Sequence, residues 1–86
     1  MYYTYLIISQ KKKWIYIGST RDLKKRFLEH NRGEVKSTKF YSPFDLLYYE
    51  AYREYRLARK RELELKNKGQ QKECLFRRLD IQGGVA

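Results

Sequence analysis

The chain has 86 residues, and its 20 Lys and Arg against 10 Asp and Glu leave a net charge of +10 at neutral pH. This length gives one domain with a modest core, and a composition that is 42% hydrophobic with a single proline excludes a disordered chain. The positive charge favours a polyanionic partner: nucleic acid, or an anionic membrane surface as the alternative.

A β-hairpin is predicted at the start of the chain. Residues 2–9 are rich in Tyr, Ile and Thr, residues 10–13 are polar, and residues 14–18 are again aromatic and β-branched. The lysines of the turn follow the first apolar stretch instead of preceding it, which is not the order of a signal peptide. No apolar run approaches the ~20 residues that span a bilayer, so we expect a cytoplasmic protein that does not enter membranes.

The turn also fixes which side chains of the hairpin share a face. If Ser9 pairs with Trp14, then Tyr5 faces Gly18 across the two strands. In that register Tyr5 and Tyr16 point to the same side of the sheet, whereas a slip of one residue would separate them.

A helix is predicted after the hairpin. The segment from Ser19 to Asp22 has the spacing of a helix N-terminus with a capping acid, and the helix should run to about Asn31 with Gly33 as its stop. Arg26 and His30 are four residues apart, so they share a face of this helix next to its apolar stripe.

The remaining elements complete an α+β fold of three antiparallel strands flanked by about three helices, in a domain over residues 1–80. They are a polar and basic loop over 34–42, a buried strand over 45–51, a charged helix over 53–68 that stops at Gly69, a short helix over 71–79 and a flexible tail over 81–86.

One acidic residue breaks the pattern of the charged helix. At about 100° per residue, its apolar stripe is formed by Ala51, Tyr55, Ala58 and Leu65. Glu62 falls in the middle of this stripe, where a carboxylate is costly unless it is paired or binds a cation. Three interpretations stay open: Glu62 pairs with a buried arginine, the stripe ends before it, or it is a metal ligand that faces the sheet.

These residues form an ordered series along the chain. It consists of Tyr3-Thr4-Tyr5, then Tyr16-Ile17-Gly18, then Arg26 and His30, and then Glu62 within Arg61-Glu62-Leu63-Glu64-Leu65-Lys66. The series resembles the GIY-YIG nuclease superfamily over roughly residues 2–68, and above all its small stand-alone members. It is similar to the N-terminal nuclease module of the bacterial excision-repair incision subunit and to homing-endonuclease catalytic domains. The chain departs from the pattern where Tyr3-Thr4-Tyr5 replaces Gly-Ile-Tyr, but the final tyrosine is kept.

The resemblance implies a metal-dependent endonuclease that hydrolyses DNA phosphodiester bonds. Glu62 would hold one divalent ion per site, Mg²⁺ or Mn²⁺, because such an ion keeps several waters and needs few protein carboxylates. Arg26 would contact the phosphate, where a guanidinium can bond two oxygens at once. Without the resemblance, Arg26 would be taken for a surface arginine of the helix.

The resemblance also assigns roles to the side of the sheet that carries Tyr5 and Tyr16, which we call the tyrosine face. Tyr5 would deprotonate or orient the attacking water, and Tyr16 would share its hydrogen-bonded cluster, although both could simply pack in the sheet. His30 would accept a proton from Tyr5, bond a phosphate or cap the helix end. Gly18 would keep the turn into the helix or the substrate free of a side chain.

Two basic segments are predicted to contact DNA phosphates: Lys36, Thr38 and Lys39 in the loop, and Lys11, Lys12 and Lys13 in the hairpin turn. A solvated run of charge is the alternative for both. Neither segment implies readout of bases, so protein partners or an unusual DNA structure would supply specificity, and the oligomeric state stays open.

Two other functions compete with the nuclease. A basic nucleic-acid-binding module that does not cleave explains the charge and the aromatic residues equally well. It does not explain a carboxylate within an apolar helix stripe. A basic domain on a membrane surface is disfavoured, because no helix combines a strong apolar face with a basic opposite face.

Overall fold

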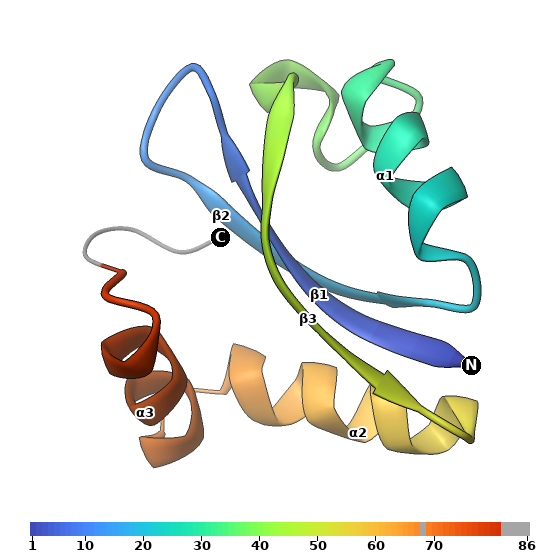
Figure 1. Ribbon diagram of the computed structural model, residues 1–86. Helices are drawn as coiled ribbons and strands as arrows, with labels where there is room; N and C mark the ends of the chain where they lie inside the picture. Colours follow the sequence, from blue (N-terminus) through green and yellow to red (C-terminus); the bar gives the residue numbers. More distant parts are fainter. Residues whose placement is uncertain (68, 82–86) are drawn as a thin grey trace.

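The computed structural model describes residues 1–67 and 69–81, and in this part of the chain three strands and three α-helices follow one another with one short 3₁₀ helix (Figure 1). In chain order the elements are β1 (Tyr2–Ser9), β2 (Ile15–Thr20), α1 (Leu23–Asn31), η1 (Lys39–Tyr41), β3 (Phe44–Tyr52), α2 (Tyr55–Lys66) and α3 (Gln70–Arg78). The strands form an antiparallel sheet in the order β2-β1-β3. The predicted α+β fold is therefore confirmed, while the predicted tail over 81–86 lies outside the described residues except for Ile81.

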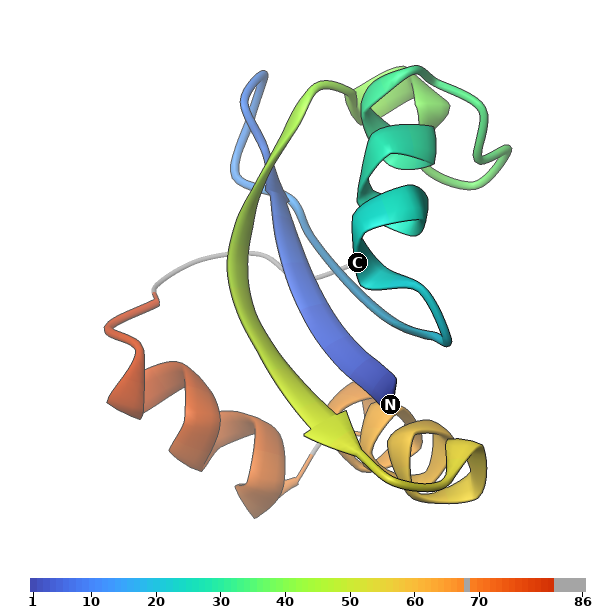
Figure 2. The same cartoon turned by 45° about the vertical axis from the view of Figure 1, so that its right-hand side comes forward.

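The helices cover both faces of the sheet, with α1 on one face and α2 and α3 on the other (Figure 2). Because successive side chains of a strand point to opposite faces, β1 contributes to a core on each side. The core under α2 and α3 is formed by Leu6, Ile15, Ile17, Leu65, Leu75 and Phe76. The core under α1 is formed by Tyr5, Ile7 and Phe44, with half-buried aromatic residues packed around them. No helix of the described residues has the length and apolar composition that crossing a membrane requires.

The predicted hairpin register is confirmed, since Tyr5 pairs with Gly18 and Ile7 pairs with Tyr16. The expectation of a buried third strand is wrong. β3 has β1 as its neighbour on one side and lies at an edge of the sheet, so Leu47 and Tyr49 are exposed. A run of apolar residues indicates a strand, but it does not show whether the strand is central or at an edge.

The start of α1 also differs from the prediction. Asp22 is the N-cap itself, and its carboxylate accepts a hydrogen bond from the backbone N–H of Lys25 at 3.0 Å. Ser19 therefore takes no part in capping, and its hydroxyl is directed to α2 instead. The predicted stop is confirmed, because Gly33 has a φ of 71°, which glycine adopts without strain.

The second helix is shorter than predicted at both ends, and Gly69 does not stop it. α2 is followed by Asn67 as its C-cap, and Gly69 is the N-cap of α3. The predicted stripe holds for Ala58, Glu62 and Leu65, which are buried, but Tyr55 is 47% exposed. Ala51 belongs to β3.

A buried hydrogen bond fixes α2 against the sheet. The hydroxyl of Thr4, in the middle of β1, donates to the backbone carbonyl of Ala58 at 2.7 Å, and both residues are fully buried. Thr4 stands where the family pattern has an apolar residue, so its hydroxyl replaces apolar contact with a specific bond. This contact sets the position from which α2 presents Glu62.

Candidate active site

A buried chain of hydrogen bonds joins Tyr5, His30 and Thr38 on the α1 face of the sheet. Tyr5 Oη lies 2.8 Å from His30 Nε2, and His30 Nδ1 lies 2.8 Å from Thr38 Oγ1. The Thr38 hydroxyl has Val35 O as its own acceptor at 3.5 Å, so its oxygen is left to accept from Nδ1–H. This arrangement assigns the proton of the neutral imidazole to Nδ1 and leaves Nε2 to accept from the Tyr5 hydroxyl.

Burial sets the protonation states of this pair. Burial raises the pKa of the Tyr5 hydroxyl above its ordinary value, Tyr16 adds to the increase, and the nearby Arg26 opposes it. The pKa of His30 is lowered to about 4. Burial is the main cause, the charge of Arg26 adds to the decrease, and Glu29 opposes it. At neutral pH the phenol is therefore protonated and the imidazole is neutral, with Nε2 free to receive a proton.

Tyr16 and Gly18 complete the tyrosine face from β2. The Tyr16 ring is centred 6.4 Å from the Tyr5 ring and 5.2 Å from the His30 ring. A Cβ atom at Gly18 would lie 2.6 Å from Tyr5 Oη and 3.0 Å from Tyr16 Cε2. Gly18 is needed because Tyr5 faces it across the hairpin, which differs from the predicted reason of space for a turn or a substrate.

Arg26 reaches the same region from α1. Its side chain is 39% exposed, and Nη1 lies 3.1 Å from Glu29 Oε1, one helical turn further on. Its positive charge lowers the pKa of both Tyr5 and His30. Arg26 therefore stands beside the buried pair and is open to an anion from solvent.

The carboxylate of Glu62 is surrounded by donors although the residue is only 3% exposed. Ser19 Oγ donates to Oε1 at 2.5 Å, Arg59 Nη1 lies 2.7 Å from the same oxygen, and Lys66 Nζ lies 2.6 Å from Oε2. Burial alone would raise the pKa of Glu62, but hydrogen bonds from Lys66, Ser19 and Arg59 lower it below its ordinary value. The carboxylate is therefore ionised at neutral pH.

This arrangement decides among the interpretations of the charged helix. The stripe continues through Glu62, and its cationic neighbours are not buried, since the side chains of Arg59 and Lys66 are 50% and 38% exposed. Sequence analysis missed both cations, although their positions three residues before and four residues after Glu62 place them on its face of the helix. It also missed Ser19, which lies 43 residues away in the chain.

Glu62 lies on the other side of the sheet edge from the tyrosine face. The Tyr16 side chain points to the α1 side of β2, and a Cβ atom at Gly18 would point there too, whereas Ser19 points to the α2 side, where it meets Glu62. Lys66 bridges the two sides, because its Nζ binds Glu62 and also lies 5.6 Å from the centre of the Tyr16 ring. The predicted catalytic residues thus form two groups that meet around the end of β2.

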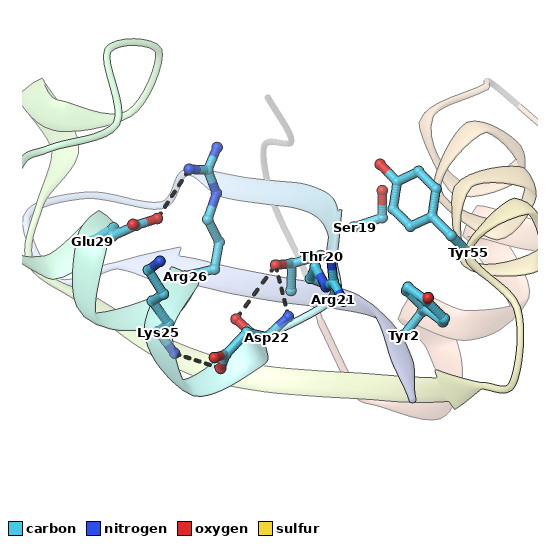
Figure 3. A pocket seen from close by; sticks show the side chains of 9 residues that line it. All are labelled: Tyr2, Ser19, Thr20, Arg21, Asp22, Lys25, Arg26, Glu29 and Tyr55. Carbon is cyan, nitrogen blue, oxygen red and sulfur yellow. Dashed lines mark hydrogen bonds and ion pairs between the residues drawn. The ribbon is translucent and has the colours of Figure 1, made fainter.

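A groove of about 690 Å³ opens at this end of β2 (Figure 3). Its lining residues are Tyr2, Ser19, Thr20, Arg21, Asp22, Lys25, Arg26, Glu29 and Tyr55. Arg26 and Glu29 line it from α1, and Tyr55 lines it from α2, with Ser19 between them. The groove therefore runs from the arginine next to Tyr5 to the serine that holds Glu62, and its volume suits a nucleotide-sized group.

The oxygen atoms of Glu62 and Ser19 are ligands of the kind that Mg²⁺ prefers, not the nitrogen and sulfur ligands that Zn²⁺ prefers. Within residues 1–67 and 69–81, no group of three or more His, Cys, Asp and Glu residues could hold a metal. An ionised carboxylate beside the hydroxyl of Ser19 is an oxygen-donor set, and Mg²⁺ accepts one or two carboxylates while it keeps its waters. An ion at Glu62 would have to displace the contact with Arg59 or with Lys66.

The predicted phosphate-contacting residues lie in different environments. Lys11, Lys12 and Lys13 at the hairpin turn are exposed, and so are Lys36 and Lys39. Thr38 does not fit its predicted role, because it is fully buried and its hydroxyl is bonded to His30. Thr38 therefore orients the imidazole.

Comparisons with known proteins show which family the chain resembles. The family model described as the GIY-YIG catalytic domain matches residues 1–74. A UPF0213 protein of Staphylococcus saprophyticus is 37% identical over 67 residues, which are 77% of this chain and 82% of the relative. UPF0213 proteins of Streptococcus pyogenes serotypes M5 and M3 are 49% identical over 41 residues, which are 46% of this chain and 45% of each relative. No solved structure gives a significant match.

Proposed function

Because the chain belongs to the GIY-YIG family of nuclease domains, we propose that it is a metal-dependent endonuclease that hydrolyses DNA phosphodiester bonds. The observation that carries the proposal is the pairing of Tyr5 Oη with His30 Nε2 at 2.8 Å, with Arg26 beside them and an ionised Glu62 around the same end of β2. Hydrolysis of a phosphodiester requires an activated water, a counter-charge for the phosphate and help for the leaving oxygen. A hydroxyl with a neutral imidazole, a guanidinium and a carboxylate that can hold a metal ion are suited to supply them.

Tyr5 and His30 would act together on the attacking water. A phenol with a raised pKa is a poor base by itself, but it can pass its proton to Nε2 while its oxygen takes a proton from the water. The hydroxide then attacks phosphorus and the bond to the leaving oxygen breaks. The leaving oxygen takes a proton from solvent, and His30 returns its proton through Tyr5 to solvent, which restores the resting pair. The Thr38 hydroxyl keeps the imidazole in the tautomer that this transfer needs.

Arg26 and Glu62 would act on the phosphate from the two ends of the groove. Arg26 binds non-bridging oxygens and so stabilises the charge that develops on them. Glu62, with the hydroxyl of Ser19, holds the divalent ion, which when bound supplies positive charge next to the phosphate and the leaving oxygen. DNA as the substrate is supported by the net charge of +10 and by the family.

Nicking of supercoiled plasmid in Mg²⁺, in Mn²⁺ and in EDTA tests this function. We expect nicking by the wild type only with a metal, and a loss of about 10²-fold or more in Glu62→Gln and Arg26→Ala, since each removes a group that acts on the transition state. Two matched controls should nick normally. Glu64→Gln removes a carboxylate two residues after Glu62 on α2, and Arg77→Ala removes an exposed arginine on α3.

Two outcomes would refute the proposal. Equal nicking by the wild type and by both site variants would mean that the activity comes from a contaminant. DNA binding that weakens steeply with salt, without cleavage of any DNA form, would instead support the non-cleaving module.

A further inference from the structure

Phe40, in the middle of η1, has the most exposed large apolar side chain of the described residues, with 76% of its surface accessible. A single exposed apolar residue is common and needs no explanation by itself. Three further observations distinguish Phe40: the rigidity of its backbone, the charges around it and its closeness to the Tyr5–His30 pair.

The residues on either side of Phe40 are fixed. Thr38, two positions before it, is fully buried and bonded to His30. Tyr41, the next residue, stacks on Trp14 with ring centres 3.9 Å apart and planes 10° from parallel, and its carbonyl accepts from Ser9 Oγ at 2.6 Å. The exposed ring is therefore carried by an ordered segment, although residues 34–42 were predicted as a loop.

One ammonium group lies by the exposed ring, and a second lies by the ring of the next residue. Lys39 Nζ lies 5.2 Å from the centre of the Phe40 ring, and Lys12 Nζ lies 5.0 Å from the centre of the neighbouring Tyr41 ring. Lys36 is exposed on the preceding segment. An aromatic face beside ammonium groups matches a nucleotide, because the base can stack on the ring while the phosphates meet the lysines.

The closeness to the catalytic pair follows from the chain itself. Phe40 is two residues from Thr38, so their Cα atoms lie at most roughly 7 Å apart. Thr38 in turn contacts His30 directly. The segment that carries Phe40 therefore also orients His30, and a base stacked on Phe40 would lie at the end of α1 that holds His30.

We propose that Phe40 and Lys39 form a stacking subsite for an unpaired base of the DNA strand that is cut. The bases of an intact duplex are stacked on one another and do not offer a free face, whereas single strands, flaps and forks do. The substrate class is thus DNA with unpaired nucleotides beside the cleavage position. This inference rests on the proposed nuclease function for the cut, but the binding itself needs no metal.

Binding in EDTA tests the subsite separately from cleavage. Fluorescence anisotropy is measured with three labelled DNAs: a short single strand, the same single strand with abasic positions, and the corresponding duplex. The proteins are the wild type, Phe40→Ala, Phe40→Trp and the control Tyr49→Ala, which removes another exposed aromatic residue, from the edge strand β3.

We expect Phe40→Ala to weaken binding of the single strand about tenfold and to change binding of the abasic strand and the duplex less than about twofold, since stacking needs a base. Phe40→Trp should bind the single strand as the wild type does, and Tyr49→Ala should be unchanged. The inference is overturned if Phe40→Ala weakens all three DNAs equally, or if it weakens none. If the wild type binds the single strand as expected but nicks no DNA in Mg²⁺ or Mn²⁺, the nuclease function is refuted and the subsite is not.

Discussion

At the scale of single residues, the depth of His30 governs both chemistry and stability. The imidazole is fully buried between Tyr5 and Thr38, and it is neutral at pH 7 because burial lowers its pKa to about 4. Protonation would place an unpaired charge among aromatic rings. The residue that we propose as the proton acceptor is thus one that the fold keeps unprotonated at rest.

Stability should therefore fall as the pH is lowered from about 6.5 to about 4. Between the ordinary pKa of 6.5 and the folded value of about 4, the unfolded chain binds a proton that the folded chain does not. The contribution of His30 to the free energy of unfolding is complete above pH 6.5. It decreases by on the order of 3 kcal/mol as the pH falls to about 4. Urea unfolding at a series of pH values measures it.

His30→Gln is the control for this pH dependence, because an amide does not titrate there. Its stability should be flat between pH 6.5 and pH 4.5. The lowered pKa values of Glu50 and Glu62 cost stability mainly below about 4.5, so only the lowest part of the window overlaps with their titration. A wild-type curve without slope between pH 6.5 and pH 4.5 would contradict the assignment.

Gly18→Ala should damage the site and the fold together. The added Cβ would lie 2.6 Å from Tyr5 Oη and 2.7 Å from Tyr5 Cζ, so the tyrosine ring or the strand must shift. Such overpacking costs about 1–3 kcal/mol. Thermal unfolding of Gly18→Ala beside Gly69→Ala measures the effect, since a Cβ at Gly69 has nothing within 4 Å. Equal melting temperatures for the two variants would show that Tyr5 does not depend on the space at Gly18.

Some of these residues could be predicted from the sequence and others could not. Alternation along the strands predicts that Tyr5 and Tyr16 share a face, and helical spacing predicts that Arg26 and His30 do. The partners of His30 and the contact of Ser19 with Glu62 depend on segments that are apart in the chain. Local pattern contains no information on such contacts, so it assigned Ser19 to a helix cap instead.

At the scale of elements, α2 holds Glu62 in place by contacts with two strands of the sheet, β1 and β3. Thr4 binds the carbonyl of Ala58, and Arg61 Nε lies 3.0 Å from Glu50 Oε1 on β3. These contacts fix the rotation of the helix, so that Glu62 meets Ser19 at the end of β2. Arg59 and Lys66 then neutralise the carboxylate from solvent.

Removal of Lys66 should strengthen metal binding. An ion at Glu62 competes with the ammonium group at 2.6 Å, so Lys66→Met should bind Tb³⁺ roughly threefold to tenfold more tightly than the wild type. Luminescence of Tb³⁺ sensitised by nearby tyrosines reports the binding.

Lys60→Met is the matched control on the same helix, since Lys60 is exposed and forms no ion pair within the described residues. Its Tb³⁺ affinity should equal that of the wild type, and Glu62→Gln should not bind. Weaker binding by Lys66→Met would mean that the lysine supports the ion instead of competing with it.

The elements themselves were more predictable than their ends and surroundings. The aromatic and β-branched runs predict β1 and β2, the run of Leu and Tyr predicts β3, and helical periodicity predicts α1 and α2. Gly69 illustrates the limit, because glycine is common both after one helix and before the next, and here it is the N-cap of α3. The edge position of β3 depends on which strand pairs with which, and that is set by the whole fold.

At the scale of the whole molecule, a charge of +10 is carried by a body whose smallest extent is 17 Å. Any bound DNA is therefore close to many of its cations, and the release of counterions should dominate its affinity. The hairpin turn with Lys11, Lys12 and Lys13 extends this basic surface at the far end of the sheet from Thr20.

Replacement of Lys11, Lys12 and Lys13 by Ser should reduce the salt dependence of DNA binding. If all three contact phosphates, the slope of log K against log salt should become shallower by about 2 to 3 for duplex DNA in EDTA. The double variant Arg77→Ser with Arg78→Ser, on α3, should leave the slope unchanged. Equal changes in both variants would indicate a general effect of net charge, and no change in the first would indicate a solvated turn.

The contact between Tyr5 and Gly18 also bears on how divergent relatives can be recognised. Tyr3 and Thr4 do not touch the catalytic pair: Tyr3 packs on Tyr49, and Thr4 binds Ala58 on the other side of the sheet. The Tyr5–His30 pair therefore does not constrain these two positions, whereas the ring of Tyr5 requires glycine opposite to it. A sequence signature that requires a tyrosine on the first strand and a glycine at the position paired with it on the second strand would recognise relatives in which the rest of the first triplet has changed.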